Sequence, residues 1–92
     1  MGGLGAEFDP DKNEQNTRER GLSFAQAAEF DFETATYAVD DRRDYGEIRF
    51  RALGYLGARL HALVFVGIPD GIRVISFRKA NQREVMLYES QT

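Results

Sequence analysis

The chain has no cysteine and only one histidine, and each shortage removes a class of function. Without cysteine there is no disulfide framework and no thiolate metal site, which fits a reducing compartment. A zinc centre needs more ligands than the single His61 can supply. The sequence also lacks a glycine-rich phosphate loop, which argues against nucleotide binding of that kind. We therefore expect neither a resident metal nor a cofactor.

Long apolar runs are also missing. None approaches the roughly 18 residues of a membrane span, and no signal-peptide pattern opens the chain. Ninety-two residues suit one domain whose core is too small to enclose a large cofactor. We expect a cytoplasmic protein with no membrane contact. Residues 1–6, rich in glycine, are expected to be flexible, and residues 7–92 to form a single domain.

The net charge of −3 conceals an uneven distribution of charge along the chain. Residues 1–41 carry three basic and ten acidic residues, whereas residues 42–84 carry nine basic and four acidic residues. A basic half of this kind can bind nucleic acid even though the sequence pI is about 5.1. The alternative is that the cations are scattered over a solvated surface, and composition alone does not decide between the two.

Two short helices are predicted before any strand. Asp9 can cap a helix that starts at Pro10, and Gly21 suits the left-handed conformation that ends one. Ser23, with Gln26 three residues later, has the pattern of a capping box at the start of a second helix. Helices this short need a sheet to pack against.

Alternation of apolar and polar residues predicts a small antiparallel sheet of three to four strands followed by a C-terminal helix. The expected strands are residues 47–54, 58–66 and 72–77, with a shorter strand near 34–39, and the last helix spans residues 80–89. The fold class is therefore α+β, with the helices covering the apolar face of the sheet.

The register of the first long hairpin is expected to place the apolar faces of its two strands on the same side of the sheet. A three-residue loop at 55–57 places Arg51 opposite His61, whereas a two-residue loop would turn arginines toward the core. We therefore predict the longer loop, with Phe50 and Val64 facing the helices, and a five-residue loop at the next hairpin. One polar face would then carry Glu47, Arg49, Arg51, Arg59, His61 and Arg73.

Further cations follow the last predicted strand. Arg78 and Lys79 come directly before the C-terminal helix, which places them at the rim of the sheet. Phosphate is the natural ligand there, because the planar arginine fork binds phosphate oxygens in pairs and stays charged. The alternative is a solvated corner with no ligand.

Arginines combined with a glutamate and a histidine suffice for metal-free cleavage of RNA. In that reaction the ribose 2′-hydroxyl attacks the adjacent phosphate and expels the 5′-oxygen. Glu47 or His61 could accept the hydroxyl proton. For each a structural role is the alternative: cross-strand ion pairs for Glu47, and a partly buried spectator position for His61.

Motifs along most of the chain resemble the BrnT family of ribonuclease toxins. Family sequences open with Phe-Glu-Trp-Asp-Pro-x-Lys, then Asn and Lys-His-Gly-Val-Ser-Phe; Asp9-Pro10-Asp11-Lys12, Asn16 and Arg20-Gly21-Leu22-Ser23-Phe24 fall in step. Their Glu-x-Arg and Gly-Arg-x-Leu strands correspond to Glu47-Ile48-Arg49-Phe50 and Gly57-Ala58-Arg59-Leu60. Their IRIISAR-type signature corresponds to Ile72 to Lys79, with Ala80, Glu84 and Tyr88.

The sequence departs from the family pattern at four places. Phe8 replaces the usual Trp, and Arg20 replaces the usual His. Val66-Gly67-Ile68 replaces Thr-Glu-Arg, and Phe77 takes the place of a small residue. The third change removes one acidic and one basic residue from the expected site, so a divergent or weakly active toxin is the alternative.

The resemblance implies a RelE-like fold and a metal-independent endoribonuclease toxin of a type II toxin–antitoxin system that inhibits translation. The expected catalytic residues are Glu47, Arg59, Arg73 and Arg78, and the expected RNA-binding residues are Arg49, Arg51, His61 and Lys79. Two other functions are left open: a catalytically silent homologue that keeps antitoxin binding and autoregulation, and a nucleic-acid-binding module unrelated to toxins.

The implied partner is a BrnA-like antitoxin with a ribbon-helix-helix DNA-binding part. Promoter DNA would be contacted only through the antitoxin complex. An antitoxin segment with acidic and apolar residues would compete with RNA for the arginine face. Alternatively, the antitoxin would dock on the N-terminal helices.

Overall fold

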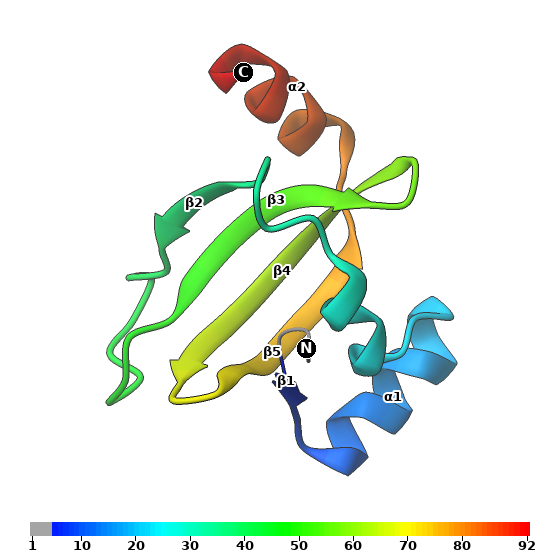
Figure 1. Cartoon of the computed structure of the whole chain (residues 1–92), viewed down its shortest axis with the longest axis vertical. Helices are drawn as coiled ribbons and strands as arrows, with labels where there is room; N and C mark the ends of the chain where they lie inside the picture. The colour runs from blue at the N-terminus through cyan, green and yellow to red at the C-terminus, as the bar shows by residue number, and fades with distance from the viewer. Residues whose placement is uncertain (1–4) are drawn as a thin grey trace.

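The computed structural model describes residues 5–92, which form a five-stranded mixed sheet with helices packed against it (Figure 1). The elements in chain order are β1 (Gly5–Glu7), α1 (Pro10–Arg20), the 3₁₀ helix η1 (Phe24–Glu29), β2 (Thr36–Val39), β3 (Phe50–Leu56), β4 (Arg59–Ile68), β5 (Gly71–Lys79) and α2 (Gln82–Gln91). The strand order is β1-β5-β4-β3-β2. The α+β class is confirmed, but the sheet has more strands than predicted and is not purely antiparallel.

The additional strand is β1, which pairs in parallel with β5. Gly5 lies beside Gly71, and Ala6 packs against the core. A side chain at Gly71 would block this approach, because its Cβ would lie 2.1 Å from the Gly5 carbonyl oxygen. Gly5 and Ala6, which were expected to belong to a flexible start at residues 1–6, are thus part of the sheet, and residues 1–4 lie outside the described part of the chain.

The predicted start signals of both N-terminal helices are confirmed. Asp9 caps α1 by accepting a 2.9 Å hydrogen bond from the Asp11 amide, and the helix ends at Gly21, whose φ is 65°. Ser23 and Gln26 form the capping box of η1. Only one of the two is an α-helix, since the second segment winds as a 3₁₀ helix.

The main core lies between the sheet and the layer formed by α1 and η1. It gathers Leu22, Phe24, Ala27, Phe30, Ala52, Leu63, Phe65, Ile72, Val74 and Phe77. The buried Asn16 fastens α1 to this core, because its side-chain amide donates 2.9 Å hydrogen bonds to the carbonyls of Leu22 and Phe77. We call the sheet face on this side the core face.

Both hairpin loops are shorter than predicted. Leu56 pairs with Arg59 and Ile68 pairs with Gly71, so each loop contains two residues. The three-residue loop at 55–57 and the five-residue loop after β4 are therefore wrong.

The shorter first loop changes which residues share a face. Arg51 lies opposite Val64, not His61. Phe50 packs against the main core as predicted, but Val64 points to the opposite side of the sheet. The expectation that a two-residue loop would bury arginines was wrong, because the face that carries Arg51 is open to solvent rather than covered by α1 and η1.

His61 and Arg59 lie toward the core face, away from Arg51. His61 alternates with the core residues Leu63 and Phe65, is 4% exposed, and places its ring 5.4 Å from that of Phe77. Its Nδ1 lies 2.8 Å from the Arg59 carbonyl oxygen. The prediction that His61 and Arg59 share one polar face with Arg51 is therefore wrong.

A bulge in β5 decides the direction of its arginines. Phe65 pairs with Val74 but Val64 pairs with Ser76, so β5 has one extra residue at this point. The bulge reverses the alternation of side chains beyond it. As a result Arg73 and Arg78, five positions apart, both leave the core face.

The C-terminal helix α2 packs on the side of the sheet opposite α1 and η1, at one end (Figure 1). Tyr88 lies in a small second core with Leu60 and Ala80. Its hydroxyl also donates a 2.9 Å hydrogen bond to the Thr34 carbonyl. Because α2 covers only one end of this face, the rest of it is left as a hollow.

Candidate functional site

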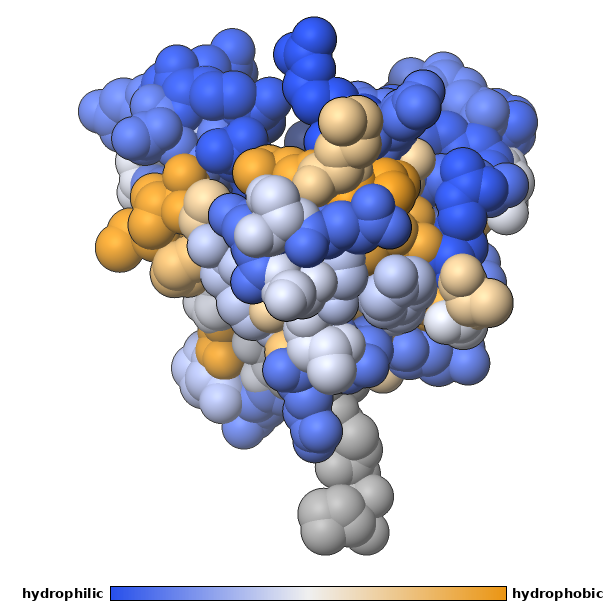
Figure 2. Space-filling model, turned by 90° about the horizontal axis from the view of Figure 1, so that it is seen from above, coloured by the Kyte–Doolittle hydropathy of each residue, from blue (hydrophilic) through white to orange (hydrophobic). Residues whose placement is uncertain are grey.

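A cavity of about 470 Å³ lies over the sheet face opposite the core face, bounded by α2 and by the chain after β2. We call it the groove. Two rows of paired residues cross its floor, Ala38-Arg51-Val64-Ser76 and Thr36-Leu53-Ala62-Arg78. Figure 2, a view onto the α2 end of the molecule, shows apolar residues exposed between hydrophilic ones. The floor is therefore mostly small or aliphatic, with arginine rising from it.

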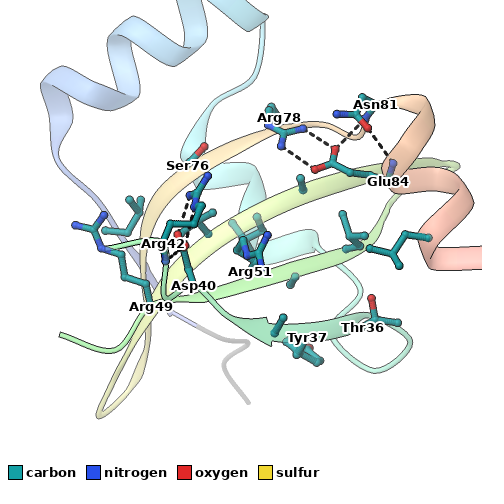
Figure 3. A pocket seen from close by; sticks show the side chains of 18 of the residues that line it. Thr36, Tyr37, Asp40, Arg42, Arg49, Arg51, Ser76, Arg78, Asn81 and Glu84 are labelled. Atoms are coloured by element: carbon teal, nitrogen blue, oxygen red, sulfur yellow. Dashed lines mark hydrogen bonds and ion pairs between the residues drawn. The ribbon is translucent and has the colours of Figure 1, made fainter. Parts of the chain in front are cut away.

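Positive charge dominates the lining of the groove. It contains Arg42, Arg49, Arg51, Arg78 and Arg83 against only two carboxylates, Asp40 and Glu84. Figure 3 shows Arg51 between the pair Asp40–Arg42 on one side and the pair Arg78–Glu84 on the other. An excess of arginine over carboxylate in a concave surface attracts anions.

The Asp40–Arg42 pair, at one side of the groove, fixes the chain after β2. Asp40 is buried and accepts hydrogen bonds of 2.7 and 2.8 Å from the Arg42 guanidinium. These bonds are the main reason that the pKa of Asp40 falls to about 2. The Asp40 amide donates to the Arg49 carbonyl at 2.7 Å. Asp40 therefore anchors two arginines to the mouth of the groove.

A second cluster lies beside this pair. Glu47 accepts hydrogen bonds from Arg49 at 3.1 Å and from Arg73 at 2.5 Å. The bond from Arg49, and then the charge of Arg73, lower the pKa of Glu47, so this carboxylate is ionised at neutral pH. The Arg49 guanidinium also stacks 4.0 Å from the centre of the Tyr45 ring.

At the opposite side, Arg78 is held by Glu84 of α2. Its two terminal nitrogens donate hydrogen bonds of 2.7 and 2.8 Å to the two Glu84 oxygens. These bonds lower the pKa of Glu84 and raise that of Arg78. Glu84 also belongs to the capping box of α2, where it exchanges hydrogen bonds with Asn81.

Arg51, at the centre, differs from its neighbours. It is exposed and makes no side-chain hydrogen bond or ion pair within residues 5–92. Hydrogen bonds from Arg42 and Arg78 are the main cause of the lowered pKa values of Asp40 and Glu84, and the charge of Arg51 adds to both. Arg51 is thus a cation whose fork is free to take an anion.

The structure brings together only part of the predicted site. Arg49, Arg51 and Arg78 line the groove, and Glu47 and Arg73 join them through Arg49. Three predicted residues lie elsewhere: Arg59, His61 and Lys79 are on or toward the core face.

Four charged residues of the groove were not predicted as site residues: Asp40, Arg42, Arg83 and the partner of Arg78, Glu84. Asp40 and Arg42 belong to a run of mixed charges with no recognisable pattern. For Glu84 a signal existed, because Asn81 with Glu84 three residues later has capping-box spacing and fixes the carboxylate near Arg78.

The described residues contain neither a cluster of metal ligands nor a membrane-spanning helix. Within residues 5–92 no three His, Asp or Glu side chains come close enough together to hold a metal ion. None of the helices in that range has the length and apolar character needed to cross a bilayer.

Comparison with known proteins identifies the family. No curated protein shows significant similarity to the chain. The model of the BrnT toxin family, described as the ribonuclease toxin BrnT of a type II toxin–antitoxin system, matches residues 8–84. That match covers most of the chain, including every strand of the groove and the Arg78–Glu84 pair. The chain therefore belongs to the BrnT family of ribonuclease toxins of type II toxin–antitoxin systems.

Proposed function

We propose that the groove binds RNA and that the protein is a metal-independent endoribonuclease toxin with a RelE-like fold, which arrests translation. The observation that carries this proposal is the position of Arg51. It is an unpaired cation at the centre of a concave arginine-rich surface, with further cations on both sides. Arginine in such a position binds a phosphate group and can stabilise the negative charge that develops on it.

The proposed reaction uses the ribose of the RNA itself. The 2′-oxygen forms a bond to the adjacent phosphorus, and the bond from phosphorus to the 5′-oxygen breaks. The 2′-hydroxyl proton passes to the Glu47 carboxylate, and the leaving 5′-oxygen takes a proton from water. The products are a 2′,3′-cyclic phosphate and a 5′-hydroxyl. Arg51, Arg73 and Arg78 would bind the phosphate and balance its added charge.

The surroundings of Glu47 have two opposite effects on its role as proton acceptor. Two arginines hold its carboxylate in one place and keep it ionised, which a proton acceptor requires. The same contacts make it a weak base, because they lower its pKa. Proton transfer would therefore be efficient only after the phosphate has drawn Arg49 and Arg73 away from the carboxylate.

The antitoxin partner that the family implies would be a BrnA-like protein with a ribbon-helix-helix DNA-binding part. The complex would repress its own promoter in the cytoplasm, with the antitoxin making the DNA contacts.

The experiment that tests the proposal is incubation of the purified protein with RNA in the presence of EDTA. We expect cleavage to persist and to leave 2′,3′-cyclic phosphate and 5′-hydroxyl ends. Substrates with 2′-deoxyribose should remain intact. Cleavage of the deoxy substrate, or loss of cleavage in EDTA, would contradict the mechanism.

A second function is favoured by one observation, the ion pairing of several arginines with carboxylates. Arg49, Arg73 and Arg78 are each paired with a carboxylate, and the Thr-Glu-Arg pattern at 66–68 is absent. A catalytically silent homologue that binds antitoxin would have the same appearance. It would bind RNA weakly and leave it uncleaved in the same assay.

A further inference from the structure

The contact between Arg78 and Glu84 has the geometry of an anion already bound. Two guanidinium nitrogens meet two oxygens at 2.7 and 2.8 Å, which is how arginine holds a phosphate group. Both side chains are only partly exposed, at 36% for Arg78 and 22% for Glu84. Their pair lies at the edge of the groove, in the row of the floor next to the one that contains Arg51.

Glu84 also has a second task, which does not need its charge. One of its oxygens accepts a 2.9 Å hydrogen bond from the Asn81 amide, and this completes the capping box of α2. A glutamine oxygen serves a capping box equally well. The capping role and the ion pair can therefore be separated by one substitution.

We propose that Arg78 forms a phosphate subsite which the Glu84 carboxylate occupies in the free protein, and which a phosphodiester of an RNA strand takes by displacing that carboxylate. The identity of the ligand as RNA rests on the proposed function. The bound phosphate would take the place of the Glu84 carboxylate, which is hydrogen-bonded to Arg78 and also lies in the field of Arg51. Glu84 thus sets how tightly the groove binds RNA, because every bound phosphate must replace it.

The test compares wild-type protein with Glu84→Gln in binding to a fluorescent 2′-O-methyl RNA hexamer, which cannot be cleaved through a 2′-hydroxyl. We expect the variant to bind about threefold to tenfold more tightly, the range for removing a competing ion pair that is only partly exposed. The matched control is Glu14→Gln, which makes the same change of net charge by removing an exposed pair with Arg18 on α1. It should change binding by less than about twofold.

Two further measurements fix the cause. Adding Arg78→Gln to Glu84→Gln should abolish the gain, because the freed fork is then absent. In the wild-type protein, exchange of the Asn81 amide hydrogen should accelerate when the hexamer binds, since the displaced carboxylate no longer accepts it.

Equal or weaker binding by Glu84→Gln overturns the subsite, because Glu84 then only positions Arg78. This result is separable from the proposed function. If the wild-type protein fails to cleave unmodified RNA while Glu84→Gln still binds the hexamer more tightly, the nuclease proposal fails and the subsite stands.

Discussion

Glu47 accepts a 2.5 Å hydrogen bond from Arg73. Glu47 comes just before β3 and Arg73 lies in β5, and β4 separates these two strands in the sheet. The bond spans the sheet just beyond the groove and joins the candidate proton acceptor to a candidate phosphate ligand. Arg49 binds the same carboxylate through its other oxygen. The three side chains therefore form one unit, in which removal of one partner changes the setting of the others.

Replacement of Arg73 by alanine should slow RNA cleavage by about a hundredfold or more, which is the usual loss when a donor to the transition-state charge is removed. The measurement is the single-turnover rate on a short RNA, with circular dichroism to confirm that the variant folds. An unchanged rate in a folded variant would exclude Arg73 from the mechanism.

Arg59 provides the matched comparison for Arg73. It is also a strand arginine, but it is exposed and lies away from the groove at the β3–β4 turn. Arg59→Ala should change the cleavage rate by less than about threefold, because a distant surface charge contributes little. A loss as large as that of Arg73→Ala would mean that the sheet end near the turn also contacts RNA.

Arg51 should contribute mainly to binding. Because Arg51 lines the groove without a carboxylate partner among the described residues, Arg51→Met removes one phosphate contact without leaving a carboxylate alone. The affinity for the 2′-O-methyl hexamer should fall, and the slope of log affinity against log salt should become shallower by about 0.7, the value for one phosphate of a single strand. An unchanged slope would place the bound phosphate elsewhere.

The helix starts could be predicted because their chemistry is local. Asp9 and Ser23 satisfy amides two or three residues away, so the sequence near each cap contains the whole interaction. The same holds for Gly21, whose left-handed conformation depends only on the end of α1. By contrast, β1 is only three residues long and depends on Gly71 far along the chain, which local patterns do not reveal.

The strand register could not be predicted because both faces of β4 are apolar. Leu63 and Phe65 enter the main core, while Leu60, Ala62 and Val64 lie on the groove side. The arginines of the neighbouring strand could therefore not be matched to a polar face of β4, because β4 has none. The bulge opposite Val64 is equally hidden, and it alone brings Arg78 to the same side as Arg73.

The residues that line the groove were predicted better than their partners. Arginines in and just before β3 and in β5 indicated a basic surface, and Arg49, Arg51 and Arg78 do line the groove. Which carboxylate neutralises each arginine depends on the register and on the position of α2, so those pairs required the structure.

Antitoxin binding should be sensitive to the groove if the antitoxin competes with RNA for it. We predict that Arg51→Glu weakens the complex with the cognate antitoxin, and that the association rate of the wild-type protein falls as salt rises. Arg59→Glu makes the same charge change outside the groove and should bind normally. Normal binding by both variants would instead favour docking on α1 and η1.

Gly54 should be intolerant of a side chain. A Cβ there would lie 2.6 Å from the tip of the Phe30 ring and 2.9 Å from the Ala35 side chain, so the core would have to move. Gly54→Ala should lower the free energy of unfolding by about 1–3 kcal/mol, the usual cost of overpacking. Gly67→Ala in β4 is the control, because a Cβ there meets nothing within 4 Å. Equal urea midpoints for the two variants would contradict this packing.

Asp40 should give stability a dependence on acid pH. Mainly because of the Arg42 hydrogen bonds, its pKa is about 2 in the folded protein, below the value of about 3.9 expected in an unfolded chain. The folded state therefore binds fewer protons between these values, and the contribution of Asp40 is complete above about pH 4 and lost as the pH falls toward about 2. Asp40→Asn should lower the free energy of unfolding by about 2 kcal/mol at pH 7, and the difference from wild type should shrink below about pH 4.

Urea unfolding of the wild-type protein and of Asp40→Asn at pH 7, 5, 4 and 3 measures this difference. Glu14→Gln, which breaks an exposed pair, should differ from wild type by less than about 0.5 kcal/mol throughout. If the difference for Asp40→Asn stays constant from pH 7 to 3, the carboxylate contributes through its shape and hydrogen bonds rather than through its charge.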